Sequence, residues 1–249
     1  MSTIEGFRKK CVKIMPNFLR TLLRPFWRMV FIPYNKIRLM VNSKLCVKMC
    51  VGWERADFIY NKTFDYVRHS SLELVAREIN ENQVQGNVAE LGVFQGEFAQ
   101  YINRIFPDRK LYLFDTFEGF VENDMKNEKI NDYHFTDAIT FDETSTNIVL
   151  KKMKYKENCV IKKGYFPATA KDVEDTFAFV NIDVDLSEPT YNGLCWFYPR
   201  LEKGGYIFVH DYNHRDWTGA KVGVKKFAAE YDIPYFPLSD QGCSVVFMK

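Results

Sequence analysis

The chain has 249 residues, 47% of them hydrophobic and 27% charged, with a formal net charge of +2. This composition is ordinary for a soluble globular protein, and the length suffices for one α/β domain with a sizeable core plus an appendage. No run of about eighteen uninterrupted apolar residues occurs. Because Arg20, Arg24 and Arg28 also interrupt the first apolar stretch, neither a membrane span nor a signal peptide is expected.

Basic residues are concentrated at the start of the chain. The first 50 residues hold eleven Lys and Arg and a single acid, Glu5, whereas the remaining 199 hold 23 basic and 31 acidic side chains. This contrast predicts a basic amphipathic arm over residues 1–52 and a separate domain over 53–249. Apolar side chains such as Phe26 and Trp27 favour packing of the arm on the domain or on a second subunit. Peripheral contact with an anionic membrane surface or a lipid-linked glycan, and nucleic-acid binding, are the alternatives.

Six cysteines lie at positions 11, 46, 50, 159, 195 and 243, and no two of them form a Cys-x-x-Cys pair. Spacing of this kind is typical of reduced thiols, which predicts a cytoplasmic protein. If the arm binds lipid, the protein would be peripheral to the inner face of the membrane. No internal repeat or low-complexity tract is present.

Beyond the arm, strand patterns alternate with helix patterns. Strands are predicted at about 87–91, 110–115, 159–162, 177–183 and 206–210, and helices at 53–82, 96–105, 144–154, 191–201 and 219–230. A capping serine at 70 or 71 is expected for the first helix. The alternation predicts a doubly wound, mostly parallel sheet with helices on both faces. Two closing strands, at 233–237 and 243–248, have no helix between them and predict an antiparallel edge.

A tight turn follows the first of these strands, where the chain reads Glu-Leu-Gly-Val-Phe-Gln-Gly from Glu90 to Gly96. Gly92 and Gly96 allow the backbone to approach a ligand without an intervening Cβ. Glu90 places a carboxylate in the crevice, which would repel a phosphate and attract a ligand with an amino group and a sulfonium. The turn therefore indicates S-adenosylmethionine (SAM) in preference to a dinucleotide, although two-glycine turns also occur without any ligand.

The second strand ends in an acid, Asp115, about twenty residues after Gly92, which is the spacing at which a doubly wound fold places a carboxylate on a ribose diol. Asp115 is therefore expected to bind the SAM ribose, with a solvated strand-end acid as the alternative. The acidic and aromatic stretch 118–142 follows. It is predicted to be an irregular loop that shapes the substrate site.

Two later strands end in potential metal ligands, Asp183 and the pair His210-Asp211. Because neighbouring strand ends converge on one crevice, these three side chains are expected to share a small volume that suits Mg²⁺ or Mn²⁺. Such an ion would lower the pKa of a bound sugar hydroxyl. Without it, His210 or Asp183 would take the proton directly. Helix capping is the alternative for both acids.

Other polar residues near these strand ends have plainer interpretations. Asp185 is interpreted as a helix-capping or turn residue, and Tyr212 as a residue that packs beneath the site. His214 is interpreted as an exposed loop histidine, and His69 and His134 as structural or surface residues.

Five motifs in the same order resemble those of the macrocin O-methyltransferase family, whose members are SAM-dependent enzymes that methylate sugar hydroxyls. They are VAELGVFQG from Val88, LFDTFEGF from Leu113, GYFP from Gly164, IDVDLSEPT from Ile182 and LEKGGYIFVHDY from Leu201. The resemblance covers about 65–249 and implies a class I SAM-dependent methyltransferase (Rossmann-like) fold.

The resemblance also implies roles for particular residues. The implied cofactor-binding set is Glu90, Gly92, Gly96, Asp115, Thr116, Phe117, Tyr165 and Phe166. The implied metal ligands are Asp183, His210 and Asp211, with Asp183 and His210 also catalytic. The chain departs from the family pattern at His210, where many relatives have the second Asp of an Asp-Asp pair, and at Ser187, where a Tyr is usual.

The sequence thus predicts a SAM-dependent O-methyltransferase, assisted by Mg²⁺ or Mn²⁺, that acts on a sugar hydroxyl in a surface-polysaccharide or antibiotic-sugar pathway. A metal-independent methyltransferase and a non-catalytic SAM-binding protein are the alternatives, and a homo-oligomer is compatible with the arm. Glu90 argues against a nucleotide-dependent oxidoreductase. A nucleic-acid methyltransferase is disfavoured because no base-binding Asn/Asp-Pro-Pro-Tyr motif is present.

Overall fold

The computed structural model describes residues 65–131, 141–214, 218–240 and 242–249. Its strands are β1 (Asn87–Leu91), β2 (Leu111–Asp115), β3 (Cys159–Lys163), β4 (Phe177–Ile182), β5 (Leu201–Val209), β6 (Phe236–Pro237) and β7 (Val245–Met248). Its α-helices are α4 (Tyr66–Glu81), α5 (Ala99–Ile105), α6 (Glu122–Ile130), α7 (Thr146–Lys152), α8 (Ser187–Arg200) and α9 (Gly219–Tyr231). Short 3-10 turns lie at Lys156–Asn158 and Ala168–Ala170. The predicted arm and its boundary at 52/53 lie outside these residues and stay predictions.

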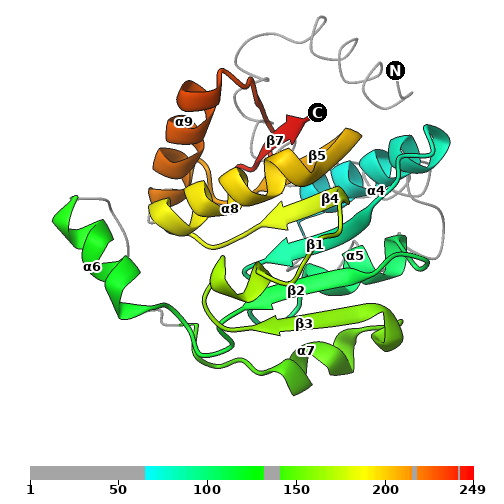
Figure 1. The fold of residues 1–249 in the computed structure, drawn as a ribbon, viewed down its shortest axis with the longest axis horizontal. Coiled ribbons are helices and arrows are strands. Elements are labelled where there is room, and N and C mark those ends of the chain that lie inside the picture. The colour runs from blue at the N-terminus through cyan, green and yellow to red at the C-terminus, as the bar shows by residue number, and fades with distance from the viewer. Residues whose placement is uncertain (1–64, 132–140, 215–217, 241) are drawn as a thin grey trace, which may run out of the picture. The chain divides into compact units, whose positions relative to one another are not determined.

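The seven strands form one sheet in the order β3-β2-β1-β4-β5-β7-β6 (Figure 1). The first five are parallel to their neighbours. Strand β7 runs antiparallel to both β5 and β6. The predicted doubly wound sheet with an antiparallel edge is therefore confirmed.

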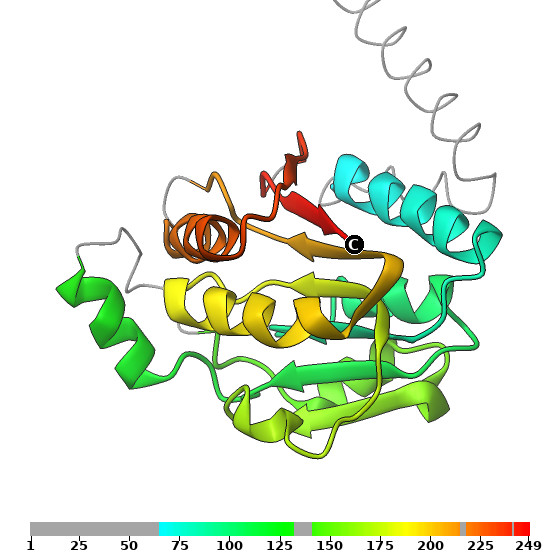
Figure 2. The same ribbon diagram turned by 45° about the horizontal axis from the view of Figure 1, so that its top comes forward.

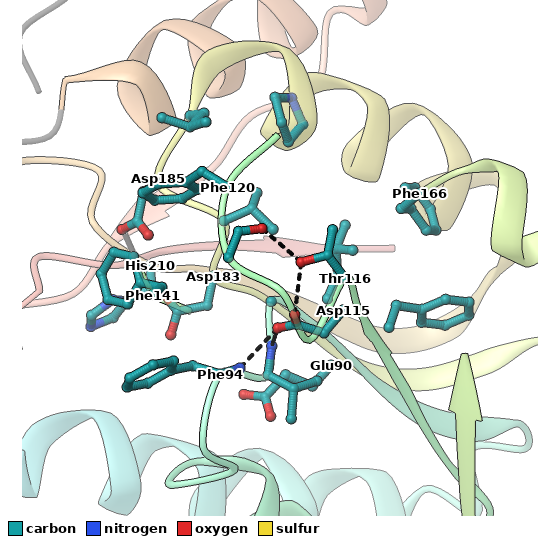
Figure 3. Close-up of a pocket in the computed structure, with 18 of the residues that line it drawn as sticks. Glu90, Phe94, Asp115, Thr116, Phe120, Phe141, Phe166, Asp183, Asp185 and His210 are labelled. Carbon is teal, nitrogen blue, oxygen red and sulfur yellow. Dashed lines mark hydrogen bonds and ion pairs between the residues drawn. The ribbon is translucent and has the colours of Figure 1, made fainter. Parts of the chain in front are cut away.

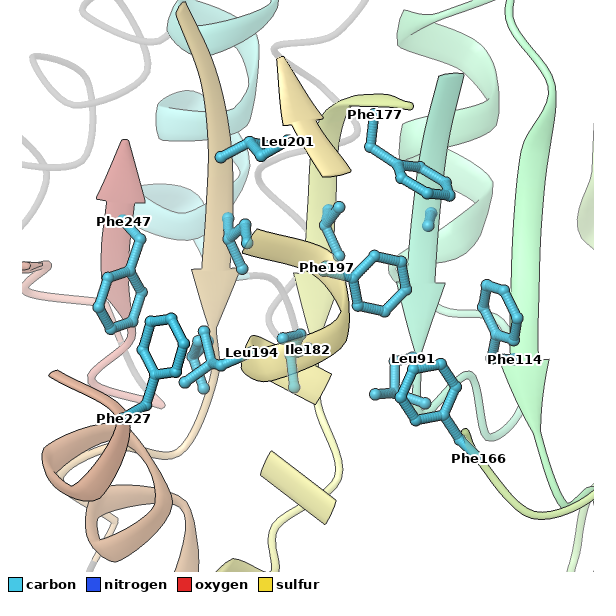
Figure 4. Close-up of a cluster of buried hydrophobic side chains, with 14 of the residues drawn as sticks. Leu91, Phe114, Phe166, Phe177, Ile182, Leu194, Phe197, Leu201, Phe227 and Phe247 are labelled. Carbon is cyan, nitrogen blue, oxygen red and sulfur yellow. The ribbon is translucent and has the colours of Figure 1, made fainter. Parts of the chain in front are cut away.

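Helices cover both faces of the sheet. Helices α8 and α9 pack against one face and α4, α5 and α7 against the other (Figures 1 and 2). A strand covered on both faces should be apolar throughout, and all six residues of β4 are buried. Beneath α8 and α9 lies an aromatic core that includes Phe114, Phe166, Phe177, Phe197, Phe227 and Phe247 (Figure 4). This core fixes the strand ends that carry the polar residues.

Several local predictions were wrong. The N-cap of α4 is Asp65, whose side chain accepts a hydrogen bond from the Arg68 amide, so Ser70 and Ser71 lie inside the helix. The stretch 118–142 contains a helix, α6, which sequence periodicity did not show because its buried side chains include the acids Asp124 and Glu128. Helix α8 begins four residues earlier than predicted, at Ser187, and β5 begins five residues earlier, at Leu201.

No helix in the described ranges is long and apolar enough to cross a membrane. Within the same ranges Cys159, Cys195 and Cys243 are free thiols. Strand order reverses between β1 and β4, because β2 and β3 lie on one side of this pair and β5 on the other. In an open α/β sheet the carboxyl ends of the strands at such a reversal form the ligand crevice.

Candidate active site

A cavity of about 340 Å³ opens at this reversal point. Its wall is built from the turns after β1, β2 and β3, the ends of β4 and β5, and the first turn of α4 (Figure 3). A volume of this size is typical of small-molecule sites. The strand ends therefore place most of the polar residues singled out from the sequence around one space.

The carboxylate of Asp115 holds two of these turns together. One oxygen accepts hydrogen bonds from the amides of Val93 (2.7 Å) and Phe94 (2.9 Å), in the turn after β1. The other accepts from the amide of Phe117 (2.6 Å), in the turn after β2. Because a carboxylate has about four acceptor positions, Asp115 can bind a ribose hydroxyl and still hold the turns. The position of Asp115 fits the predicted contact with the ribose. Asp115 also has a structural role, because it holds the two turns together.

Glu90 lies at the bottom of the cavity and is 1% exposed. Its Oε1 accepts a hydrogen bond from Asn181 Nδ2 (2.9 Å), while Oε2 is buried without a hydrogen-bond partner. Burial, followed by the nearby charge of Asp183, raises the pKa of Glu90 well above its usual value. A buried carboxylate oxygen without a donor is costly. A cationic ligand group would relieve this cost, so the amino group of SAM fits the site.

Gly92 is required by the protein itself rather than by a ligand. Its φ is +84°, in the region that favours glycine, and a Cβ would lie 1.9 Å from the carbonyl oxygen of Asp183. The turn after β1 therefore packs directly on the end of β4. A side chain at Gly92 would displace the backbone of Asp183, which adds a structural reason for this glycine to the expected approach of a ligand.

The other predicted cofactor residues divide into two groups. Thr116, Tyr165 and Phe166 line the cavity, as Glu90, Gly92 and Asp115 do. Gly96 and Phe117 are absent from its lining. A Cβ at Gly96 would meet Val149 and Met153 beneath the turn, and Phe117 is 4% exposed. These two residues therefore contribute to the packing of the turns and not to the lining of the cavity.

Asp183, His210 and Asp211 meet in the wall of the same cavity, as the sequence predicted. His210 Nδ1 lies 3.0 Å from Asp183 Oδ1 and 2.8 Å from Asp211 Oδ2. One potential ligand atom from each of the three residues lies within 4.8 Å of the others. Two carboxylates and one imidazole form a donor set that suits a divalent ion.

Sequence reasoning missed Arg68, which lies in the first turn of α4 and is almost fully buried. Its Nη2 donates to Asp183 Oδ2 (2.8 Å) and to Asn181 Oδ1 (3.1 Å). Its guanidinium lies 4.0 Å from the ring centroid of Phe98. No motif surrounds Arg68 in the sequence, so only the fold reveals this contact.

The charges of this cluster stabilise one another. Burial alone would raise the pKa of Asp183, but His210 and Arg68 outweigh it and hold that pKa below its usual range. Burial alone would lower the pKa of His210, but Asp183 outweighs it and raises the pKa to about 10. The carboxylates of Asp183 and Asp211 therefore favour the protonated form of His210.

Asp185 lies in the turn between β4 and α8, has a left-handed φ of 60° and lines the cavity, while Leu186 occupies the N-cap position of α8. It is therefore a turn residue, one of the two roles expected from the sequence, and not the helix cap. Burial and then the neighbouring Asp211 raise the pKa of Asp185 well above its usual value.

Helix α6 brings part of the predicted substrate loop to the site. Asp124 from this helix lines the cavity and accepts a hydrogen bond from the Tyr165 hydroxyl (2.9 Å). Glu128 accepts hydrogen bonds from the amide (2.7 Å) and hydroxyl (2.5 Å) of Ser187 at the start of α8. The serine that departs from the family pattern thus anchors α6 to α8. Phe120 and Phe141 add an apolar wall near Asp185 (Figure 3).

Of the remaining polar residues, Tyr212 and His69 behave as expected, whereas His214 was predicted to be exposed and is half-buried. Tyr212 is 8% exposed and its hydroxyl lies 2.7 Å from that of Tyr235, so it packs beneath the site. His69 packs edge-on against Phe98 and Tyr101. His214 is half-buried and absent from the cavity lining. His134 lies outside the described residues.

Comparison with known proteins agrees with this geometry. A protein-family model described as Macrocin-O-methyltransferase (TylF) matches residues 62–248. The demethyldecarbamoylnovobiocin O-methyltransferase of Streptomyces niveus is 25% identical over 178 residues, which span 67% of this chain and 67% of that protein.

Two solved structures share the fold. The O-methyltransferase NovP matches with a TM-score of 0.60 and 21% identity, over 73% of this chain and 79% of NovP. The calicheamicin methyltransferase CalS11 matches with a TM-score of 0.61 and 18% identity, over 84% of this chain and 91% of CalS11. The fold is that of a class I SAM-dependent methyltransferase.

Proposed function

The chain belongs to the macrocin O-methyltransferase family and is a SAM-dependent O-methyltransferase, and we propose that it methylates a sugar hydroxyl with the help of a divalent ion. The observation that carries the proposal is the cavity that joins two groups of residues. Glu90 and Asp115 form one group, Asp183, His210 and Asp211 form the other, and all of these residues line the same cavity. The first group suits the cofactor and the second suits the acceptor.

The cofactor side supplies two anchors at a fixed separation. Glu90 Oε2 would accept a hydrogen bond from the SAM amino group, and Asp115 would accept one from a ribose hydroxyl while its bonds to Val93 and Phe94 hold the turn. Transfer requires the acceptor oxygen, the methyl carbon and the sulfur to lie in line. Two anchors on rigid strand ends restrict the orientation of the cofactor and so support this alignment.

The acceptor side handles a proton and a developing alkoxide. A divalent ion held by Asp183, His210 and Asp211 would lower the pKa of the acceptor hydroxyl. Asp183 is already paired with Arg68 and is therefore a poor proton acceptor. Asp185 lines the same space beside Asp211 and, unlike Asp183, has its pKa raised by burial and by Asp211 although His210 lowers it, so we assign it as the proton acceptor in preference to Asp183. In its ionised form Asp185 would take the hydroxyl proton, so that the acceptor oxygen could bond to the methyl group as the methyl–sulfur bond breaks.

A sugar acceptor is supported by the family and by the named Streptomyces relative. It is also supported by the polar groups of Asp124, Tyr165 and Asp185, which can bind several hydroxyls, and by Phe120, which offers an apolar face to a ring. An antibiotic-sugar or surface-polysaccharide pathway is the setting that we propose.

The basic arm, residues 1–52, is proposed to serve assembly or acceptor access rather than chemistry, because its charge lies outside the residues matched by the family. Packing on the domain or on a second subunit remains our preferred role. Removal of the arm should then change the oligomeric state or the solubility. Loss of binding to anionic vesicles alone, with the oligomer unchanged, would support membrane contact instead.

The acceptor class can be tested by product analysis. The full-length protein is incubated with methyl-labelled SAM, Mg²⁺ and either a panel of nucleotide sugars and glycosides or a panel of catechols and other phenols. Label should appear as a sugar methyl ether. Label confined to phenols would contradict a sugar acceptor, and tight NAD binding without SAM binding would contradict methyl transfer.

A further inference from the structure

Between β6 and β7, one buried acid links the described residues 238–240 to the described residues 242–244. Asp240 is 6% exposed and its two oxygens accept from the amide and the hydroxyl of Ser244, each at 2.5 Å. Two backbone bonds close the turn, from Leu238 to Ser244 (2.8 Å) and from Cys243 to Asp240 (3.2 Å). Buried charge-assisted bonds of this kind hold a turn in one conformation.

Gly242 of this turn lies against the imidazole of His210. A Cβ at Gly242 would lie 1.9 Å from His210 Nε2 and 2.3 Å from Cε1. At such distances a side chain at position 242 would require the imidazole to move, so the imidazole occupies the space that this side chain would need.

The same segment also brings a carboxylate, that of Asp240, near the imidazole ring of His210. Asp65, His210 and Asp240 each offer one ligand-type atom within 4.8 Å of the others. His210 Nδ1 also contacts Asp183 and Asp211. Carboxylates therefore surround the imidazole from the start of α4, from the β6–β7 turn and from both strand ends. A histidine that ligates a metal is commonly oriented by an acceptor near its other ring nitrogen.

We propose that Gly242 and Asp240 are positioning residues that fix the imidazole of His210 with Nδ1 toward Asp183 and Asp211. This arrangement agrees with the histidine at position 210, where many members of the family have an aspartate. An aspartate side chain would be too short to reach the space that His210 Nε2 occupies. It would therefore require neither a glycine at position 242 nor a carboxylate near the end of its side chain. The inference rests on the proposed function only in giving His210 a role at the site.

Four variants of the full-length protein test this pairing. Gly242→Ala should displace the imidazole, because the atom that must move is the end of a side chain and not backbone. Asp240→Asn should loosen the turn while preserving its shape. His210→Asp should tolerate a further Gly242→Ala substitution in the double variant. Ser239→Ala, an exposed position in the same turn, is the matched control.

The first measurement is the side-chain ¹⁵N spectrum of the histidines. The chain has four histidines, and His210→Asp identifies the His210 signals by their disappearance. Gly242→Ala and Asp240→Asn should shift the His210 signals and leave those of His69 in place, and Ser239→Ala should shift neither. His210 signals that stay unchanged in both variants would overturn the proposal. If Gly242→Ala does not fold, Asp240→Asn decides the outcome.

The second measurement is a double-mutant cycle read as Mn²⁺ affinity by calorimetry and as thermal unfolding. Gly242→Ala should weaken Mn²⁺ binding at least tenfold in the natural chain and less than twofold in the His210→Asp chain. Equal effects in both backgrounds would overturn the proposal and make Gly242 a structural residue of the turn. If the natural chain binds no Mn²⁺, the proposed metal-assisted function is contradicted. The positioning role is then still decided by the histidine spectra and by whether the effects of the two substitutions on the unfolding temperature are non-additive.

Discussion

Arg68 and Asp183, 115 residues apart in the sequence, form a buried ion pair in which Nη2 lies 2.8 Å from Oδ2. The side chains are 8% and 22% exposed. The carboxylate expected to bind a metal therefore has a permanent organic cation on one oxygen and His210 on the other. Arg68 orients Asp183 and keeps it ionised, which suits the proposed role of Asp183 as a metal ligand better than a role as a base.

Arg68→Ala should destabilise the domain by about 3 kcal/mol, because removing one partner of a buried pair leaves the other charge uncompensated. Urea denaturation of the cofactor-free protein measures this change. Arg77→Ala, at an exposed position on the same helix, is the control and should have little effect. A loss below about 1 kcal/mol for Arg68→Ala would show that the pair resembles a solvent-screened surface bridge.

Glu90→Gln should stabilise the cofactor-free protein and weaken SAM binding. Since the folded-state pKa of Glu90 is raised above its usual 4.5, ionisation of Glu90 opposes folding. The stabilisation that the neutral form of Glu90 provides is fully present at pH values below its usual pKa. It is lost as the pH rises toward the pKa that Glu90 has in the folded protein. The difference in melting temperature between variant and natural protein should therefore be small at pH 4 and grow with pH.

In the same variant, SAM should bind at least tenfold more weakly, since a hydrogen bond to a charged group contributes about 1.5–3 kcal/mol. Calorimetry near neutral pH measures this. An affinity equal to that of the natural protein would mean that Glu90 does not receive the amino group.

Asp115→Asn should weaken SAM binding by about 1–3 kcal/mol, because the amide can no longer accept from both turns and from a ribose hydroxyl. The side-chain amide nitrogen of the variant would face a backbone N–H, and both groups are hydrogen-bond donors. The turn after β1 should therefore open. Calorimetry gives the affinity, and hydrogen exchange at Val93 and Phe94 reports the turn. Asp108→Asn, an exposed acid before β2, should change neither.

Asp183→Asn should reduce turnover more than Asp211→Asn does, because Asp183 alone contacts both Arg68 and His210. SAM should still bind, since its proposed anchors are Glu90 and Asp115. Single-turnover kinetics with saturating SAM separates the two effects. A variant that loses SAM binding in proportion to activity would instead place Asp183 in the cofactor site.

Local sequence patterns predicted the elements that depend on local residues. Strands β1 and β2 were predicted within one residue, because short apolar runs end in turn residues or an acid. Helix α6 was missed because its inward side chains are Asp124 and Glu128, so it lacks apolar periodicity. The start of α8 was missed because Glu128, 59 residues away, binds Ser187 at its first turn.

The site was predicted where strand ends alone determine it, as with the meeting of Asp183, His210 and Asp211. Arg68 could not be predicted, since its role arises only when α4 packs beside β4. The role of Gly242 could not be predicted either, because the imidazole of His210 occupies the space that a side chain at position 242 would need. Contacts between distant segments carry no signal in a local pattern.

The central claim is that a divalent ion at the Asp183, His210 and Asp211 cluster assists methyl transfer from SAM to an acceptor hydroxyl. The most direct test is the transfer rate of the full-length protein after chelation and after addition of Mg²⁺ or Mn²⁺, with SAM binding measured in parallel. We predict that chelation abolishes transfer while SAM stays bound, and that either ion restores transfer. Full transfer in excess chelator would contradict the claim.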